Sequence, residues 1–209
     1  MPWHSIPKSG VQTGTAPNLR DYGEARRTFS WASARLELDG LPGGALNIAH
    51  EAIGRHLTRG RGEHLALRWL GKTGTTLDLS YAELGRRTAR FANTLRTLGI
   101  GKSDRVFGLM GRIPELYIAA LGTLRNGSVF SPLFSAFGPE PIRSRMELGD
   151  AKVLVTTEAL YRKKVMTWRH ELPKLTHVLL AECDEAALPE GTLSLAKAMA
   201  SASDQFTTE

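Results

Sequence analysis

The sequence predicts an α/β protein built on a mostly parallel sheet whose strands are joined by βαβ crossovers. Between residues 106 and 181, short apolar runs alternate with segments of helical periodicity. The apolar runs are continuous, which is typical of strands that helices cover on both faces of a sheet. Only a few residues separate successive segments, and such short connections favour right-handed crossovers between parallel strands.

The composition limits the classes of protein to which the chain can belong. With 209 residues, of which 42% are hydrophobic, it is long enough to bury a sizeable core. The net charge of +6 gives weak support for nucleic-acid binding, because basic residues are dispersed among carboxylates. The single cysteine, Cys183, excludes an internal disulfide and a multi-cysteine metal site. No apolar run reaches the roughly 18 residues of a membrane span, so we expect a cytoplasmic protein with no nucleic-acid or membrane partner.

The N-terminal segment predicts an irregular arm over residues 1–44, because glycine and proline recur there and periodicity is weak. A short helix near residues 21–27 is the one element expected in it. An α/β domain follows over residues 45–181. Its first helix covers residues 47–57 and ends at Gly60 and Gly62, with a buried face formed by Ile48, Ala52, Ile53 and Leu57.

The stretch GKTGTT, residues 71–76, has part of the pattern of a phosphate-binding P-loop. The P-loop needs a first glycine at the position where this chain has Ala66, so the pattern fails. Residues 65–71 and 76–81 alternate between apolar and polar side chains on either side of the stretch. Two alternating runs joined by glycines are typical of a β-hairpin, and we expect GKTGTT to be its loop.

A long amphipathic helix is expected after the hairpin. Ser80 is placed as its N-cap with Glu83 three residues later, which is the pattern of a capping box. Gly99 ends it. The expected buried stripe consists of Leu84, Phe91, Leu95 and Leu98, and the expected solvated side carries Arg86, Arg87 and Arg90.

The remaining elements alternate in type. Strands are expected at residues 106–110, 129–134, 152–157 and 177–181, and helices at residues 114–127, 139–148 and 158–172. Residues 182–209 form a tail with one segment of helical composition and a polar ending. We expect the chain to be interrupted there.

Ligands of open parallel sheets bind beyond the carboxyl ends of the strands, so the loops at residues 111–115, 134–139 and 156–158 are the places to search. These loops contain no nucleophile beside a base and no dinucleotide-binding glycine pattern. Arg162, Lys163 and Lys164 follow one of them and form either an anion site or a solvated helix face. From composition and spacing alone, both alternatives stay open.

Several motifs nevertheless occur in an order that resembles the N-terminal region of AMP-forming acyl-CoA synthetases. They are YAEL at residues 81–84, LGIGKSDRV at 98–106, IPEL at 113–116 and AKVL at 151–154. The stretch PLFSAFGPEPI at residues 132–142 is most similar to the acetyl-CoA synthetase branch. The resemblance covers residues 46–181. It implies the incomplete N-terminal portion of the large domain of an adenylate-forming ligase.

The resemblance also implies a reaction and its requirements. Family members convert a short carboxylate, ATP and CoA into acyl-CoA, AMP and pyrophosphate, using magnesium, a glycine-rich phosphate loop and a C-terminal lid. The segment Thr73-Gly74-Thr75-Thr76 imitates that loop, but Leu77-Asp78-Leu79 follows where the family has proline, lysine and glycine. The family's loop comes after the βα units, beyond Glu209. We therefore expect this chain to be inactive alone, with a downstream ligase fragment as a possible partner and no cofactor of its own.

Six residues are implied as a CoA-receiving site. By resemblance, Phe134, Ser135 and Ala136, together with Arg162, Lys163 and Lys164, receive the nucleotide end of CoA. The family often has two glycines where this chain has Ser135 and Ala136. The alternative is a non-catalytic α/β module that binds a CoA-like anion or a partner protein. A nucleic-acid module ranks third, because only the net charge supports it.

Overall fold

The computed structural model describes residues 19–208 and divides the chain into two compact units, residues 1–39 and 40–209. In the first unit, α1 (Tyr22–Thr28) and α2 (Trp31–Leu36) bury no side chain. The helix expected near residues 21–27 is α1, and Asp21 caps it by accepting from the backbone of Glu24. The arm also contains α2, which the sequence analysis did not predict, and residues 1–18 of it lie outside the described residues. The domain boundaries at residues 44 and 181 stay predictions.

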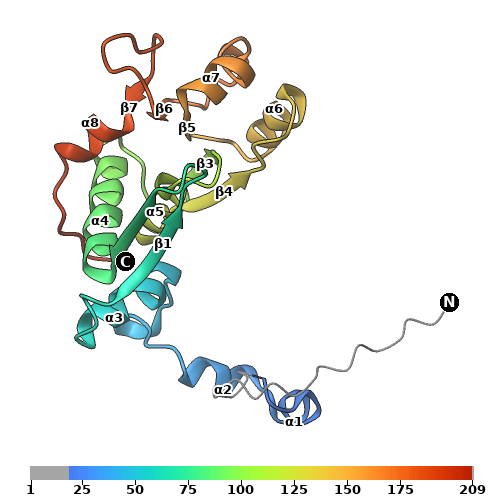
Figure 1. Ribbon diagram of the computed structural model, residues 1–209. Coiled ribbons are helices and arrows are strands. Elements are labelled where there is room, and N and C mark those ends of the chain that lie inside the picture. Colours follow the sequence, from blue (N-terminus) through green and yellow to red (C-terminus); the bar gives the residue numbers. More distant parts are fainter. Residues whose placement is uncertain (1–18, 209) are drawn as a thin grey trace. The chain divides into compact units, whose positions relative to one another are not determined.

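The second unit contains a five-stranded sheet in which every pair of neighbours is parallel (Figure 1). The predicted α/β class with a mostly parallel sheet is confirmed. The strand order is β4-β3-β5-β6-β7, which is the doubly wound order 2-1-3-4-5 of flavodoxin-like sheets. The strands are β3 (Arg105–Leu109), β4 (Val129–Leu133), β5 (Val153–Thr157), β6 (His177–Ala181) and β7 (Leu193–Ser194).

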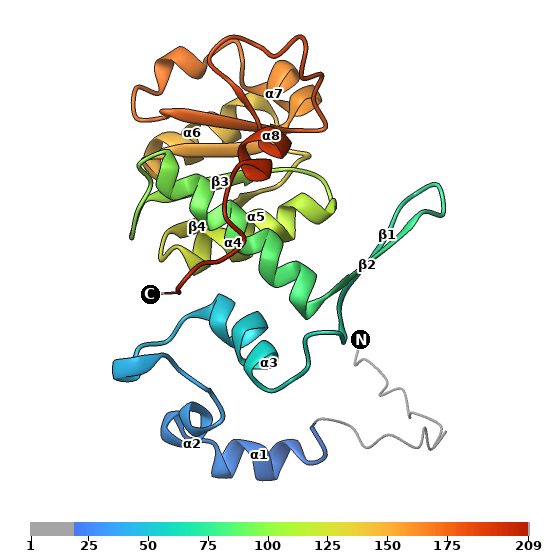
Figure 2. The same cartoon turned by 90° about the vertical axis from the view of Figure 1, so that its left-hand side faces the viewer.

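Side chains alternate between two cores, one on each face of the sheet. Val106 and Val153 belong to a core with side chains of α4, α5 and α8, whereas Phe107 and Leu154 belong to one with side chains of α6 and α7 (Figure 2). α4 packs closely on α5 at Gly122, where a Cβ atom would lie 2.8–2.9 Å from atoms of Phe91 and Thr88. The helices are α4 (Tyr81–Thr97), α5 (Pro114–Arg125), α6 (Pro139–Leu148), α7 (Glu158–Lys164) and α8 (Leu195–Ala200).

Two helix predictions need correction. Ser80 caps α4 as expected, but the carboxylate of Glu83 binds Arg86 and Arg87, so only half of the predicted capping box is present. The helix predicted over residues 158–172 ends at Lys164 and is followed by a separate 3-10 turn, Arg169–Glu171. Fifteen helical residues would extend about 22 Å, whereas a five-residue strand extends about 17 Å. A shorter helix lets the chain re-enter the sheet at β6.

The first predicted helix of the α/β unit contains a wide turn that the periodicity does not reveal. Residues His50–Gly54 form a π-helix that continues into α3 (Arg55–Thr58), and the backbone of Arg55 donates to His50 five residues earlier. This turn changes the register of the helix. Ala49 and Ile53 are buried, but Ile48 is 66% exposed, so its predicted place on the buried face is wrong.

The expected hairpin is confirmed. β1 (Leu65–Leu70) pairs with β2 (Thr76–Ser80) in antiparallel fashion (Figure 2). The backbone N–H of Gly71 donates to the carbonyl of Thr75 at 2.7 Å and closes the loop. Gly74 has a φ of 84°, which favours glycine. The guanidinium of Arg68 binds the carboxylate of Asp78 across the strands through two hydrogen bonds of 2.7 Å.

The segment after α8 lies along α4. The side-chain amide of Asn93 donates to the carbonyls of Ser203 and Gln205 at 2.7 and 2.8 Å. Arg125 donates to the carbonyl of Phe206, and the guanidinium of Arg96 lies 4.6 Å from the centroid of the Phe206 ring. These contacts fix residues 203–206 against the helical face of the sheet.

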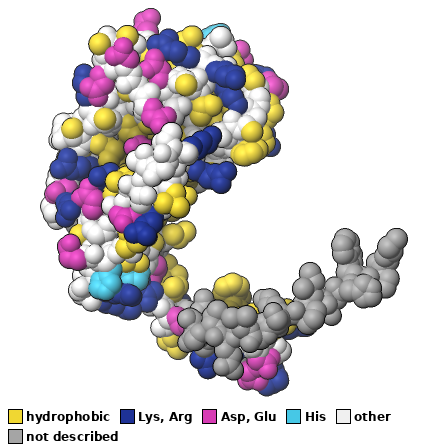
Figure 3. All heavy atoms as spheres, in the orientation of Figure 1, with side chains coloured by type: hydrophobic (Ala, Val, Ile, Leu, Met, Phe, Trp, Pro, Cys, Tyr) yellow, Lys and Arg dark blue, Asp and Glu magenta, His cyan; other side chains and the backbone are white. Residues whose placement is uncertain are grey.

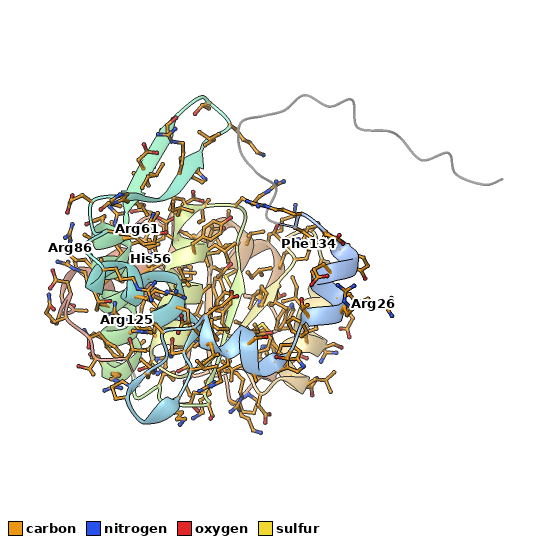
Figure 4. The ribbon with its side chains drawn as sticks, turned by 90° about the horizontal axis from the view of Figure 1, so that it is seen from below. Arg26, His56, Arg61, Arg86, Arg125 and Phe134 are labelled. Atoms are coloured by element: carbon orange, nitrogen blue, oxygen red, sulfur yellow. The ribbon has the colours of Figure 1, made fainter. Side chains whose placement is uncertain are left out.

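His56 is half-buried against Tyr81. Its ring stacks on Tyr81 at 4.4 Å between centroids, and its Nδ1 is sealed from solvent without a hydrogen-bond partner (Figure 4). Burial, followed by the positive charges of Arg61, Arg55 and Arg59, lowers the pKa of His56 below its ordinary value. The folded protein therefore disfavours the protonated ring.

This shift predicts a loss of stability between neutral and mildly acidic pH. The unfolded chain binds a proton at His56 as the pH falls below about 6.5, and the folded chain does so only at lower pH. Stability is thus fully present above the unfolded pKa and falls as the pH drops towards the folded pKa. We expect urea midpoints measured from pH 7.5 to 5 to fall less steeply in His56→Gln than in wild type. Parallel pH profiles would contradict the assignment, and His170→Gln, at an exposed position, is the control.

Candidate site at the carboxyl edge of the sheet

The strand order places a topological switch point between β3 and β5. Helix α5 follows β3, whereas α7 follows β5 and packs with the opposite core. The hydroxyl of Thr156 in β5 donates to the carbonyl of Leu109 in β3 at 2.7 Å and joins the two strands at this edge. Open α/β sheets bind ligands in the crevice beside such a point. The loops that the sequence analysis selected for the ligand search lie at this edge of the sheet, and the ligand site there stays a prediction.

The hairpin also contacts this edge. The indole nitrogen of Trp69 in β1 donates to the carbonyl of Arg112, in the loop between β3 and α5, at 2.7 Å. The two residues are 43 positions apart in the sequence. No local pattern signals the contact, so the sequence analysis missed it.

Aromatic and basic side chains stabilise the loop between β4 and α6. Phe134 is 64% exposed and meets Phe137 edge to face, with ring centroids 5.5 Å apart. The guanidinium of Arg145 in α6 lies 4.6 Å from the centre of the Phe137 ring. The loop is thus held by a stack of three side chains, with Phe134 at its exposed end.

Lys164 brings the two halves of the predicted site together. Its ammonium group donates to the carbonyls of Ser135 and Phe137, both at 2.6 Å, and so joins α7 to the loop after β4. A lysine has three N–H donors, and two of them serve these carbonyls. In this structure Lys164 holds the loop in place, which leaves little of its hydrogen-bonding capacity for an anion.

The other two predicted cations have different surroundings. Arg162 forms an ion pair with Glu158 at 2.7 Å, and a hydrogen bond from the backbone of Asp184, then the one from Arg162, lowers the pKa of Glu158. Lys163 is exposed and makes no hydrogen bond or ion pair with any residue between 19 and 208. Of the three basic residues, Lys163 has the charge most available to a ligand.

A cavity of about 660 Å³ lies on the face of the sheet that α4, α5 and α8 cover. It is bounded by these three helices and by the end of β6. Arg86, Arg87 and Arg90 line it, whereas the sequence placed them on a solvated face. Glu83 binds the first two, and hydrogen bonds led by that from Arg87 lower the pKa of Glu83. Figure 4 shows Arg86 and Phe134 towards opposite sides of the α/β unit, so the cavity is separate from the predicted loop.

Residues 19–208 contain neither a metal-holding cluster nor a membrane-spanning helix. No group of three or more histidine, cysteine, aspartate or glutamate side chains among residues 19–208 is arranged to hold a metal ion. No helix in the same span is long and apolar enough to cross a membrane. Basic and acidic side chains are interspersed on the face shown in Figure 3, in keeping with the weak support for nucleic-acid binding.

Comparison with known proteins assigns the family. The model of the AMP-binding enzyme family matches residues 55–206. The chain belongs to the AMP-binding enzyme family. The predicted resemblance is confirmed.

Relatives within the family include acetyl-CoA synthetases and solved acyl-CoA synthetase structures. The chain is 35% identical to the acetyl-coenzyme A synthetase of Bacillus subtilis over 187 residues, which cover 84% of this chain and 32% of that protein. It is 39% identical over 137 residues to the Deinococcus radiodurans enzyme of the same name, covering 66% of this chain and 21% of that one. The acyl-CoA synthetase of Brucella canis superposes with a TM-score of 0.79 at 32% identity, over 90% of this chain and 33% of that one. The chain therefore spans about a third or less of these AMP-binding relatives.

The contacts of Lys164 lead to a prediction about the loop between β4 and α6. Lys164→Met keeps much of the aliphatic stem but removes both hydrogen bonds to the loop carbonyls, so the loop should open more often. We expect faster amide hydrogen exchange over residues 134–138 in this variant, with exchange in β3 and β5 unchanged. Lys163→Met, one position earlier, is the matched control. Equal exchange of the loop in both variants would show that Lys164 does not position it.

Proposed function

We propose that this chain is the N-terminal portion of an acetyl-CoA-synthetase-like AMP-forming ligase, inactive alone, that contributes a surface for the nucleotide end of CoA. Intact ligases of this kind convert a carboxylate, ATP and CoA into acyl-CoA, AMP and pyrophosphate. The main observation in support is the contact of Lys164 with the loop after β4. It brings the two predicted halves of the CoA surface together at the carboxyl edge.

The proposed inactivity rests on the missing phosphate loop. A phosphate loop binds through free backbone N–H groups at the start of a helix. In GKTGTT the backbone of Gly71 donates to Thr75, and that of Gly74 donates to Gly71, so these groups are already used within the hairpin. The GKTGTT hairpin therefore does not fit the phosphates of ATP, and the residues between 19 and 208 provide no cluster for magnesium.

The residues at the carboxyl edge fit a phosphate-bearing ligand better than they fit ATP with its metal. The ammonium group of Lys163 is exposed and unpaired within the described part of the chain, and Arg162 retains guanidinium donors beyond those that bind Glu158 and the carbonyl of Ala187. Lys164 has a positioning role in this proposal and does not contact the ligand. Side chains at Ser135 and Ala136 keep a ligand farther from the backbone than glycines would.

The alternative is a non-catalytic module that binds a CoA-like anion or a partner protein. The cavity beside Arg90 favours it, because the guanidinium of Arg90 makes no hydrogen bond with a described residue and the cavity is large enough for a small molecule. A downstream ligase fragment is one candidate partner. For either function we propose a cytoplasmic location, because the single cysteine fits a reducing compartment.

The proposed function predicts that the chain does not catalyse the adenylation half-reaction. Purified chain, supplied with acetate, ATP and magnesium, should not exchange labelled pyrophosphate into ATP above a blank without protein. An intact acetyl-CoA synthetase in the same assay is the positive control. Acetate-dependent exchange well above the blank would show that the described fold contains its own phosphate site.

The proposed function also predicts that the chain binds CoA through its nucleotide end. CoA differs from dephospho-CoA by one phosphate, so calorimetric titration should show tighter binding of CoA, with the difference lost at 1 M salt, where the Debye length is about 3 Å. Lys163→Gln should weaken CoA binding about 2- to 12-fold, the range expected for loss of one hydrogen-bonded contact. Lys102→Gln, an exposed lysine at the amino edge, is the control. Equal affinities for the two ligands would argue against the proposed surface.

A further inference from the structure

A second cavity, of about 550 Å³, lies at the end of the sheet where β6 and β7 begin. Its walls come from α7, from the connection between α7 and β6, and from the turn that precedes β7. This places it away from the carboxyl edge and from the proposed CoA surface. The lining residues used below are Tyr161, Arg169, Leu172, Pro173, Pro189 and Gly191.

Tyr161 is the unusual residue of this cavity. Its side chain is only 2% exposed, yet its hydroxyl makes no hydrogen bond with any described residue. The hydroxyl is not sealed from solvent, unlike the indole nitrogen of Trp168 in the same core cluster. Since Tyr161 lines the cavity, its hydroxyl opens onto that space. Buried tyrosine hydroxyls normally have a partner, so the missing partner is expected in the cavity.

Arg169 gives the cavity a fixed wall and a positive charge. One of its terminal nitrogens donates to the carbonyl of Gly191 at 2.8 Å and lies 3.5 Å from that of Glu190. Gly191 has a φ of 68°, and a Cβ atom there would lie 2.7 Å from the same nitrogen. The turn is therefore built around the guanidinium. A guanidinium has five donors, so several remain for a ligand.

The polar and apolar parts of the cavity together define a ligand class. Leu172, Pro173 and Pro189 provide apolar surface, and Tyr161 and Arg169 provide hydrogen-bond donors. Two further groups face the same space: His170, which is exposed and adds positive charge when protonated, and Glu190, an exposed carboxylate that opposes it.

We propose that this cavity binds a small amphipathic organic anion. Its apolar body would lie against the leucine and proline side chains, and its oxyanion head would accept from the Tyr161 hydroxyl and the Arg169 guanidinium. The head group binds beside Arg169, because the guanidinium supplies the opposite charge. This site is independent of the proposed ligase function, since no residue of the CoA surface lines the cavity.

The test compares two isosteric probes on the whole chain. Benzenesulfonate has an aromatic body and a permanent negative charge, and benzenesulfonamide has the same shape without the charge. Calorimetric titration of wild type should show binding of the sulfonate and weaker binding of the sulfonamide. Tyr161→Phe should bind the sulfonate about 12- to 160-fold more weakly, the range expected for loss of one hydrogen bond to a charged group. Its thermal midpoint should not fall, because the hydroxyl has no protein partner. Tyr117→Phe, at a tyrosine 41% exposed on α5, is the matched control.

Three outcomes would overturn the proposal. They are equal sulfonate binding by Tyr161→Phe and Tyr117→Phe, equal binding of the two probes by wild type, and no binding of the sulfonate. Each of these results would mean that water is the only partner of the Tyr161 hydroxyl in the cavity. If Tyr161→Phe does not fold, NMR titration of wild type decides. Shifts at Arg169 Nε–H and at the amides of Tyr161 and Gly191 would support the site, and shifts confined to other regions would exclude it.

Discussion

Burial of β3 and β5 on both faces is the constraint on which the rest of the structure depends. Successive side chains of these strands point to opposite cores, so a helical layer is needed on each side of the sheet. The chain passes from β3 outward to β4 and then back across β3 to β5. Right-handed crossovers place the two connecting helices on opposite faces. The same reversal creates the crevice at the carboxyl edge, so the core and the candidate site have one physical origin.

At the carboxyl edge of the sheet, basic side chains that hold protein groups in place have fewer hydrogen-bond donors left for a ligand. Lys164 donates to two carbonyls, and Arg162 is paired with Glu158, so two of three neighbouring cations are committed to protein contacts. An exposed, unpaired cation such as Lys163 supplies only weak and salt-sensitive attraction. This arrangement suits the weak binding of a phosphate-bearing ligand. The proposed positioning residue, Lys164, and the proposed binding residue, Lys163, are neighbours in α7.

The short helix α7 serves two regions of the α/β unit. Lys164 reaches the loop after β4, while Tyr161, one turn earlier, packs in the core and opens onto the cavity before β6 and β7. Had the helix continued to residue 172 as predicted, Arg169 would not hold the turn at Gly191. The early end of α7 therefore builds the second cavity. The two candidate sites share a helix but no ligand-contacting residue.

The sequence by itself determined the fold class, the order of strands and helices over residues 65–181, the hairpin nature of GKTGTT and the family, because these follow from periodicity, turn residues and ordered motifs. It also placed residues 134–136 and 162–164 at one edge of the sheet. Only the tertiary structure decided what each of these residues does. Lys164 meets carbonyls 27 and 29 positions away, and Trp69 meets Arg112 across 43 positions. The π-turn that exposes Ile48 and the unpaired hydroxyl of Tyr161 likewise depend on packing between distant segments, which local sequence patterns do not encode.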